Sequence, residues 1–400
     1  MYINSFSMEL NHSLPFSDLQ FFYFLGAAVL FIFMGKLISG KKVAYKWLLA
    51  ILNITYISLL FTKPLEILII IVVLYLMVLG LRKWYPKDKI LIPMLLLALP
   101  VFIMKSMVFF PVEGQTDFVA EVRRIIQIAG LSYMVFKVIG LYIDERKTPG
   151  NISFLSFFNF TAFVPTLLIG PIDRFKRFDT DVNNGYAQMN ASYFAKGWNN
   201  FVLGVLYKFI IAEAIRRVVM VNLIDDGSMI YHFSYMYTYL LYLFFDFAGY
   251  SLLAIGFGNF IGIDVPINFD KPFFSVNPKE FWKRWHKSLG DWLGDYFFKP
   301  IFKDLTTRKV FTSITRQNIA LFMTFTLMGF WNGFELHYIA SGMLFGLYSV
   351  GHNYYVYRCK KGKRDVIFGN LKPQMVRYIS IFIMFNLTAF AIYIFSGKLF

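Results

Sequence analysis

Long apolar stretches, separated by short basic turns, follow one another along almost the whole chain. An α-helix needs about 20 mostly apolar residues to cross a bilayer. Stretches of this kind predict about eleven transmembrane helices, near residues 20–35, 47–61, 65–81, 90–110, 125–143, 152–170, 201–215, 235–256, 318–334, 338–356 and 378–397. The pattern therefore predicts an all-α polytopic membrane protein in which a single membrane domain covers residues 1–400.

Basic residues between these stretches predict the orientation of the chain, because cytoplasmic loops are rich in Lys and Arg. The basic clusters at 36–46, 82–89 and 358–377 are expected inside, whereas the N-terminus and the turns at 62–64 and 334–338 are expected outside. No basic region precedes the first apolar stretch, which favours a retained helix over a cleaved signal peptide.

This alternation fails in the middle of the chain. Residues 144–147 and 174–177 both have the composition of cytoplasmic loops, although the single apolar stretch 152–170 separates them. Pro165 and Gly170 favour a broken helix there, since proline removes a helical hydrogen bond. We therefore expect this stretch to be re-entrant, or the topology to be more complex than simple crossings.

The composition agrees with a membrane protein and excludes several other classes. Hydrophobic residues make up 57% of the chain, aromatic residues 20% and charged residues only 16%, which excludes disordered chains and nucleic-acid-binding modules. Basic cytoplasmic loops beside an anionic leaflet explain the net charge of +16 most simply. The single cysteine, Cys359, has no partner for an internal disulfide, and no Cys/His cluster predicts a metal site.

Residues 264–317 mix prolines, charges and aromatic side chains, so this region is expected to lie on the membrane or dip into it from the cytoplasmic side. Its run 280–296 separates an indole stripe from a basic stripe at helical spacing. The indole stripe comprises Trp282, Trp285, Leu289 and Trp292, and the basic stripe comprises Lys283, Arg284 and Lys287. An interfacial amphipathic helix explains this pattern. His286 adds a group that can act as a general base for a hydroxyl nucleophile.

Three further polar residues lie in or beside apolar stretches, where such residues line a cavity or need a partner. Asn332 follows Trp331 near the end of one stretch, His337 lies at the turn to the next, and Asp246 lies inside an apolar run. Structural and functional explanations of these residues both remain open. Motifs for nucleotide hydrolysis, serine hydrolysis and metalloprotease chemistry are absent from the sequence.

Several short motifs occur in a fixed order along the chain. They are Asn-Phe at 159–160, Gly-Pro-Ile-Asp-Arg-Phe-Lys-Arg-Phe at 170–178, Phe-Phe-Asp-Phe-Ala-Gly-Tyr-Ser at 244–251, Ile-Asn-Phe-Asp-Lys-Pro-Phe at 267–273, Phe-Trp-Lys-Arg-Trp-His-Lys-Ser-Leu at 281–289 and Met-Gly-Phe-Trp at 328–331. Together they closely resemble the membrane-bound O-acyltransferase (MBOAT) family, and within it the DltB branch of the Gram-positive D-alanylation system. The motifs at 170–175 and 268–273 favour this branch over the alginate O-acetylase branch.

The resemblance implies an MBOAT fold, a ring of tilted helices around a central tunnel with re-entrant or interfacial helices, in the cell membrane of a Gram-positive bacterium. D-Alanine would arrive as a thioester on the phosphopantetheine of a cytoplasmic D-alanyl carrier protein. It would leave toward teichoic acid hydroxyls outside, assisted by a membrane-anchored DltD-like partner. No cofactor bound to the chain itself and no nucleic-acid partner are expected.

The same resemblance assigns roles to individual residues. His286 would approach the tunnel from the cytoplasmic side and Asn332 from the outer half. Further tunnel or substrate candidates are Asp246, Trp285, Ser288, Trp331 and His337. Lys283, Arg284 and Lys287 are candidates for facing the carrier protein, because carrier proteins are acidic and opposite charges speed encounter. Plain positive-inside bias explains these basic residues as well.

The sequence departs from the family pattern at two positions. The family carries its catalytic histidine in a Trp-His-Gly motif where this chain has Trp331-Asn332-Gly333, and a later family histidine corresponds to the apolar run around Phe345. Asparagine does not serve as a general base near pH 7, although it can orient a hydroxyl or donate to an oxyanion.

Three hypotheses follow from this departure. The chain is a working D-alanyltransferase in which His286 supplies the base, a catalytically impaired DltB-like paralogue that acts as a binding or scaffold subunit, or an MBOAT enzyme for another cell-wall polymer.

Overall fold

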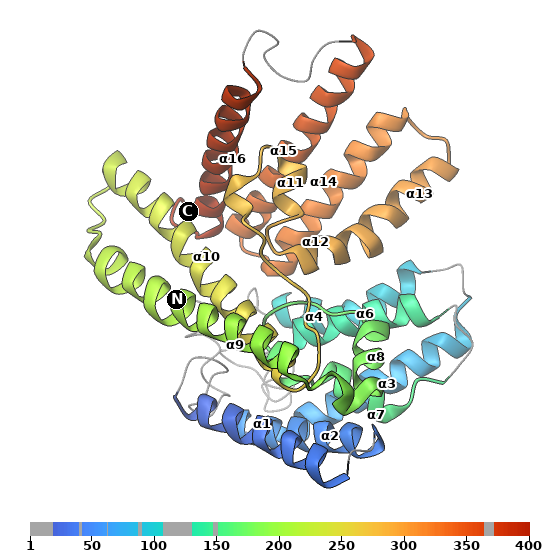
Figure 1. Ribbon diagram of the computed structural model, residues 1–400. Coiled ribbons are helices and arrows are strands. Elements are labelled where there is room, and N and C mark those ends of the chain that lie inside the picture. Colours follow the sequence, from blue (N-terminus) through green and yellow to red (C-terminus); the bar gives the residue numbers. More distant parts are fainter. Residues whose placement is uncertain are drawn as a thin grey trace, which may run out of the picture. The chain divides into compact units, whose positions relative to one another are not determined.

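The helices of the chain are described in a computed structural model, which covers residues 19–39, 42–61, 63–86, 90–106, 130–146, 151–363 and 372–400. Every regular element in these ranges is a helix (Figure 1). Part of the expected stretches 90–110 and 125–143, and part of the basic cluster 358–377, lie outside the described residues.

The α-helices vary in length because proline, glycine and polar turns interrupt the apolar runs. They are α1 (Leu19–Ser39), α2 (Lys42–Leu60), α3 (Pro64–Trp84), α4 (Leu91–Ser106), α6 (Leu131–Glu145), α7 (Phe154–Thr161), α8 (Phe175–Asn184), α9 (Ala191–Val205), α10 (Met229–Phe260), α11 (Pro278–Trp282), α12 (Lys287–Leu293), α13 (Lys299–Thr307), α14 (Ser313–Asn332), α15 (Leu336–Lys361) and α16 (Pro373–Phe395). Shorter π-helical turns cover Leu206–Ala212, Ile215–Val219 and Gly294–Phe298.

Four of the described helices, α1, α3, α10 and α16, are long and apolar enough to cross a bilayer. The apolar surfaces of α1 and α3 remain largely uncovered within the chain, as only 22% of the apolar window is buried in each. A helix with so much exposed apolar surface is stable only where lipid or another protein covers it. The all-helical membrane class is therefore confirmed, whereas these four helices do not establish the expected number of about eleven spans.

The described residues divide into two compact units. The first comprises the described residues up to Val205 together with Gly249–Pro266, and the second comprises Leu206–Ala248 and the described residues from Ile267 to Phe400. The two units are distinguished by the way their residues pack. The single membrane domain expected over residues 1–400 stays a prediction.

In the first unit, the predicted break at Pro165 and Gly170 is confirmed. Helix α7 ends at Thr161, a single 3-10 turn follows at Val164–Thr166, and Gly170 has a φ of 119° that favours glycine. Arg174 Nη1 lies 3.8 Å from Asp144 Oδ2. This ion pair joins two residues that lie on either side of the segment in the sequence.

Two fully buried asparagines hold that segment against α2. Asn53 Nδ2 donates to Asn159 Oδ1 over 3.2 Å, and Asn159 Nδ2 donates to the backbone carbonyl of Lys46 over 3.0 Å. The backbone N–H of Val164 donates to Asn53 Oδ1 over 3.3 Å. Because a buried amide must be satisfied, the Asn-Phe motif at 159–160 has a structural role in this unit.

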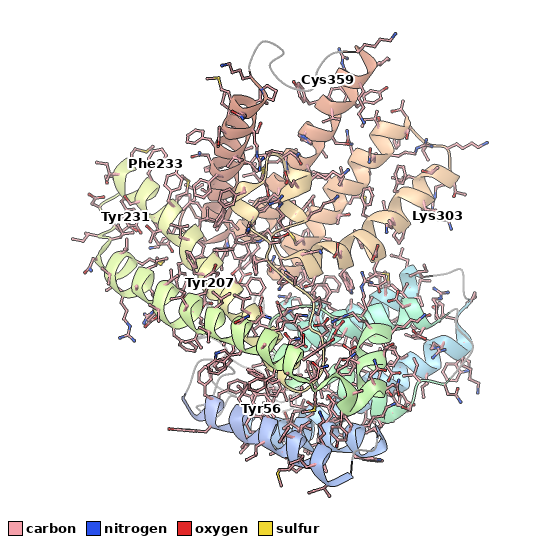
Figure 2. The ribbon with its side chains drawn as sticks, viewed as in Figure 1. Tyr56, Tyr207, Tyr231, Phe233, Lys303 and Cys359 are labelled. Atoms are coloured by element: carbon pink, nitrogen blue, oxygen red, sulfur yellow. The ribbon has the colours of Figure 1, made fainter. Side chains whose placement is uncertain are left out.

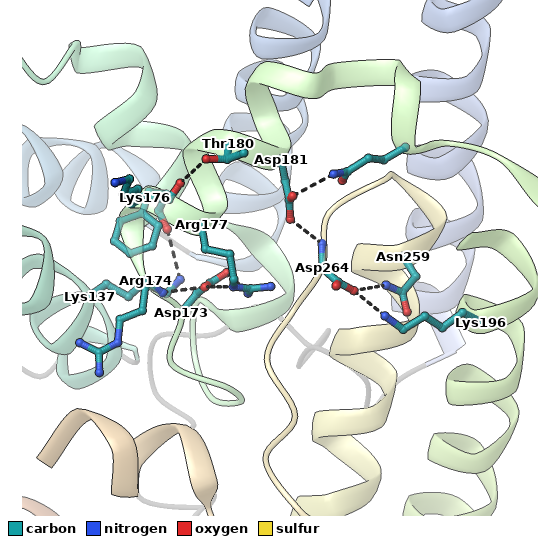
Figure 3. A network of polar contacts seen from close by, with 12 residues as sticks. Lys137, Asp173, Arg174, Lys176, Arg177, Thr180, Asp181, Lys196, Asn259 and Asp264 are labelled. Carbon is teal, nitrogen blue, oxygen red and sulfur yellow. Dashed lines mark hydrogen bonds and ion pairs between the residues drawn. The ribbon is translucent and has the colours of Figure 1, made fainter. Parts of the chain in front are cut away.

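The motif at 170–178 contributes to a second polar network of the first unit, shown in Figure 3. Asp173, which is 6% exposed, accepts from Arg177 Nε through Oδ1 at 2.9 Å, and its Oδ2 forms an ion pair with Arg177 Nη2 at 2.6 Å. Asp181 Oδ2 accepts from the backbone N–H of Asp264 over 2.9 Å, and Asp264 Oδ1 lies 2.7 Å from Lys196 Nζ. These contacts compensate buried carboxylates and join α8 to the segment after α10.

Close backbone approach joins neighbouring helices in both units. In the first unit, a Cβ on Gly256 of α10 would lie 2.9 Å from the carbonyl oxygen of Gly197 in α9. In the second unit, a Cβ on Gly342 of α15 would lie 2.6 Å from the carbonyl oxygen of Phe325 in α14. Small residues at such crossings are typical of helix packing in membranes. Asn332 is the last residue of α14, at the short turn that leads into α15.

Candidate active site

The prediction of a single amphipathic helix over the run 280–296 is wrong. The chain forms α11, leaves the helical conformation between residues 283 and 286, and resumes as α12 at Lys287. His286 adopts a left-handed backbone conformation with φ 43° and ψ 50°. That conformation costs a residue with a Cβ about 1–2 kcal/mol, so the surrounding contacts must hold it.

Helix α11 begins with a reciprocal cap. The Asn277 side chain accepts from the backbone N–H of Glu280 over 2.8 Å, and Glu280 Oε2 accepts from the backbone N–H of Val276 over 3.1 Å. Glu280 Oε1 also lies 2.6 Å from Arg284 Nη2. The charge of Arg284, which was expected to face a carrier protein, is therefore engaged within the chain.

Asn268 holds the turn at His286 from the opposite side. Its backbone carbonyl accepts from the N–H of Lys287 over 2.8 Å. Its side-chain Oδ1 accepts from Ser288 Oγ at 2.6 Å and from the Ser288 N–H at 3.3 Å, and it lies 3.2 Å from His286 Nδ1. Asn268 is fully buried. One asparagine thus connects two predicted site residues, His286 and Ser288.

Aromatic rings enclose this turn. The Phe247 ring of α10 meets the His286 imidazole edge to face at a centroid distance of 4.7 Å. Trp285, which is 5% exposed, packs at right angles to Phe269 at 5.2 Å and stacks on Phe281 at 5.6 Å. Burial in these apolar surroundings lowers the pKa of His286 to about 3. The imidazole is therefore neutral at pH 7.

The structure places Asn332 and His337 around the α14–α15 turn. Asn332 is the last residue of α14, is exposed, and donates through Nδ2 to the carbonyl of Met328 over 2.9 Å. Trp331 beside it is partly buried. His337 lies in the first turn of α15, where Nδ1 is 2.9 Å from the carbonyl oxygen of Phe395. The side chains of Asn332 and His337 thus both contact backbone carbonyl oxygens.

Phe345 occupies the apolar position for which the resemblance implies a second histidine. It is 2% exposed, lies 4.9 Å from the Trp282 ring and stacks on Phe281 at 6.0 Å. An imidazole there would have to replace ring contacts on two sides. The substitution therefore removes a titratable group and extends the aromatic packing around α11.

Residues 48–394 match the MBOAT, membrane-bound O-acyltransferase family. The chain is 32% identical to the teichoic acid D-alanyltransferase of Streptococcus thermophilus over 98% of this chain and 97% of that protein. It is 35% identical to the teichoic acid D-alanyltransferase of Bacillus subtilis over 69% of this chain and 70% of that protein. The probable alginate O-acetylase AlgI of Pseudomonas fluorescens is 32% identical over 55% of this chain and 43% of its own length.

The chain belongs to the membrane-bound O-acyltransferase family. The similarity to the D-alanyltransferase of S. thermophilus extends over 98% of the chain, whereas that to the alginate O-acetylase covers 55% of it. The resemblance to the DltB branch of the MBOAT family is therefore confirmed.

Asp246, the carboxylate inside α10, has the partner that was expected for a charge in an apolar run. Lys208 Nζ lies 2.5 Å from Asp246 Oδ1. Lys208 comes from the π-helical turn Leu206–Ala212, a geometry that occurs frequently at functional sites. Tyr207, labelled in Figure 2, meets the adjacent Phe245 ring at 5.1 Å. Asp246 is thus paired with a lysine beside an aromatic cluster of the second unit.

Two of the three basic candidates for a carrier-protein contact are exposed. Lys283 and Lys287 have exposed side chains, as does Lys303 of α13, which is labelled in Figure 2. Within the part of the chain that the structure describes, no group of three His, Cys, Asp or Glu side chains is placed to hold a metal ion.

Sequence reasoning missed two residues of this site, Asn268 and Lys208. Asn268 lies in a family motif, but a loop asparagine gives no periodic signal by itself. Lys208 is a charged residue within the apolar stretch 201–215, and the presence of Asp246 in another such stretch could have indicated the pair.

Proposed function

We propose that the chain is a teichoic acid D-alanyltransferase that moves D-alanine from a carrier-protein thioester toward teichoic acid hydroxyls. The observation that carries this proposal is the similarity to the D-alanyltransferase of S. thermophilus over 98% of the chain. The turn at His286 supports it, because it provides a neutral imidazole in a family whose chemistry is acyl transfer to hydroxyls.

The reaction needs one base and a route for one proton. The neutral imidazole of His286 takes the proton of the acceptor hydroxyl while the hydroxyl oxygen attacks the thioester carbonyl carbon. A C–O bond forms, the C–S bond breaks, and the imidazolium returns the proton to the departing phosphopantetheine thiolate. The phosphopantetheine is part of the substrate, so the chain needs no cofactor of its own.

Asn332 takes a supporting role in this proposal. Its amide neither gains nor loses a proton near pH 7, but it can donate to the oxyanion that develops on the carbonyl or orient the hydroxyl. The side chain is exposed at the end of α14. Rotation away from the carbonyl of Met328 would make its N–H groups available to a substrate.

The proposed reaction takes place across the cell membrane of a Gram-positive bacterium. We place about eleven spans around a central tunnel, with the carrier protein at the cytoplasmic side and a DltD-like partner assisting transfer. The contact of Arg174 with Asp144 supports a re-entrant segment between them, since it joins two ends that the charge pattern assigns to the same side.

A catalytically impaired DltB-like paralogue is the second candidate. The replacement of the family histidines by Asn332 and Phe345 favours it, because the only histidine then left at the motif positions is His286. Such a chain would bind the carrier protein or the DltD-like partner without transferring D-alanine.

Complementation tests these alternatives. A DltB-null strain expresses the chain, its Asn332→His variant or its His286→Ala variant, and the D-alanine ester content of teichoic acid is measured together with the amount of chain in the membrane. Esters restored by the chain and lost in His286→Ala establish the enzyme and its base. Esters restored by Asn332→His alone identify the impaired paralogue. No esters with any of the three, at normal membrane levels, contradict the proposed substrate.

A further inference from the structure

The orientation of the Asn268 amide is determined by a backbone donor of the next helix, the N–H of Ser288. The backbone N–H of Ser288 can only donate, and it points at the Asn268 side-chain atom 3.3 Å away. An amide nitrogen at that position would face the N–H with its own hydrogens. The atom is therefore the oxygen, Oδ1, and the Ser288 hydroxyl 2.6 Å away donates to the same oxygen.

The orientation of this amide decides the protonation of the neighbouring histidine. His286 Nδ1 lies 3.2 Å from the same Oδ1, and an amide oxygen accepts hydrogen bonds but donates none. Nδ1 must therefore carry the hydrogen. A neutral imidazole carries one ring hydrogen, so Nε2 then presents its lone pair.

We propose that Asn268 is a positioning residue that fixes His286 in the Nδ1-protonated tautomer and leaves Nε2 as the proton acceptor. This inference rests on the proposed function in one respect, since it assigns Nε2 to the acceptor hydroxyl. In the other tautomer the lone pair on Nδ1 would face the Asn268 oxygen, and Nε2 would carry a hydrogen and could not take a proton. Asn268 thus does for this imidazole what an orienting group does for a catalytic base.

The backbone supports the same arrangement. The Asn268 carbonyl accepts from the Lys287 N–H over 2.8 Å, and the Asp270 N–H donates to the Arg284 carbonyl over 2.9 Å. These contacts hold the segment 268–270 beside the turn that carries His286. The left-handed conformation of His286 then directs its ring toward both Asn268 and Phe247. The strain at this residue is maintained by two independent backbone contacts.

Among the residues that the structure describes, the contacts of the imidazole are with uncharged groups. The ring meets Phe247 of α10 and Asn268 of the preceding segment, and Ser288 of α12 shares the Asn268 oxygen. Among the charged side chains on the turn and on α12, Arg284 is paired with Glu280, while Lys283, Lys287 and Asp291 are exposed. Introducing a carboxylate at position 268 would therefore place a charge directly against Nδ1–H.

The tautomer can be measured without any assay of activity. The full chain is labelled with ¹⁵N-histidine in detergent micelles at pH 7, and the His286 signals are assigned by their loss in His286→Gln. We expect a protonated, pyrrole-type Nδ1 and an unprotonated, pyridine-type Nε2. His337 serves as an internal reference, because its Nδ1 faces the backbone carbonyl of Phe395, which can only accept. A pyridine-type Nδ1 at His286 would overturn the inference.

Two variants then test whether Asn268 acts through the imidazole. Asn268→Ala removes the acceptor and should lower D-alanine ester formation about 10–100-fold, the range found when a hydrogen-bond partner that orients a metal-ligating histidine is removed. Asn268→Asp keeps an accepting oxygen and should retain most of the activity. Its carboxylate favours the imidazolium and raises the pKa of His286, so the acid limb of its pH–rate profile should move to higher pH. A purely structural asparagine would not move that limb.

Asn353 provides the matched control. Its side chain also joins two elements, donating to Gln317 Oε1 at 3.1 Å and to Asn318 Oδ1 at 2.7 Å. Asn353→Ala should retain the ester yield and the pH profile. Equal losses in both alanine variants, or an Asn268→Asp profile identical to that of the unmodified chain, would overturn the positioning role. An inactive chain with a pyrrole-type Nδ1 would instead contradict the proposed function and leave the tautomer assignment standing.

Discussion

Lys208 and Asp246 form an ion pair between two segments of the second unit, with Nζ and Oδ1 separated by 2.5 Å. The lysine side chain is 13% exposed and the aspartate side chain 30%. Charges in apolar helices are costly unless paired, and removal of one partner leaves the other uncompensated. This pair therefore couples the π-helical turn at Leu206–Ala212 to the middle of α10.

We expect Asp246→Ala to destabilise the chain by about 3–5 kcal/mol, because it leaves Lys208 charged in apolar surroundings. Thermal unfolding of the purified chain in detergent measures the loss. Asp295→Ala is the control, since Asp295 lies at the same distance of 2.5 Å from Lys299 but both side chains are well exposed, at 41% and 70%. Exposed pairs contribute about 0–1 kcal/mol. Equal destabilisation by the two variants would show that burial does not determine the strength of the Lys208 pair.

The pairing also shows what the sequence could and could not predict. An aspartate inside an apolar run predicts that a partner exists, because the cost of burying a charge is general. The identity of the partner depends on how the two segments pack, and Lys208 lies 38 residues away along the chain. The break at Pro165 and Gly170 was predicted correctly, because proline and glycine act on the local backbone.

The conformation at His286, in contrast, was not predicted from the sequence. Helical spacing predicted one amphipathic helix over the run 280–296, because the side chains satisfy a helical period. The chain leaves the helical conformation where the Asn268 carbonyl accepts a hydrogen bond from the N–H of Lys287. A non-local backbone contact has no signature in periodicity, so the pattern singled out His286 as a candidate but predicted the wrong conformation there.

The stability of the chain should depend on the pH through His286. Burial lowers its pKa from the usual 6.5 to about 3 in the folded chain, so the unfolded chain binds more protons between these values. The free energy of unfolding should therefore fall as the pH drops below about 6.5, by at most about 1.4 kcal/mol per pH unit from this group. Because the side chain is only partly buried, the measured slope should lie below this maximum.

Unfolding of the chain and of His286→Gln at pH 7 and pH 5 isolates this contribution from that of the carboxylates. Between pH 7 and pH 5, the unfolding free energy of the unmodified chain should fall by more than that of His286→Gln. A constant difference at both pH values would mean that the folded and unfolded chains protonate His286 alike.

The α14–α15 crossing should tolerate no side chain at Gly342. A Cβ there would lie 2.6 Å from the Phe325 carbonyl oxygen and 2.8 Å from the Gly329 Cα. We expect Gly342→Ala to cost about 1–3 kcal/mol through overpacking. Gly351 lies on the same helix with open space around its Cβ position, so Gly351→Ala should stabilise the chain by up to about 1 kcal/mol. Thermal unfolding of both variants compares the two sites, and stabilisation by both would show that helix propensity dominates at Gly342 as well and would contradict the close crossing.

Carrier-protein recognition should depend on the exposed lysines of the His286 turn. The double variant Lys283→Glu, Lys287→Glu places two negative charges on the turn that is expected to face the carrier protein. Steering by opposite charge raises association rates by about 10–10³-fold at low salt. Reversal should slow association with a D-alanyl carrier protein at least about tenfold and weaken its salt dependence.

A second pair of lysines separates recognition from general positive charge. Lys360 and Lys361 are exposed at the end of α15, and the charge pattern assigns them to the cytoplasmic side as well. Their double replacement by Glu changes the net charge by the same amount and should leave association close to that of the unmodified chain. Association rates of both variants are measured by stopped-flow fluorescence over a range of salt concentrations. Equal slowing would show that the lysines of the turn reflect membrane orientation only.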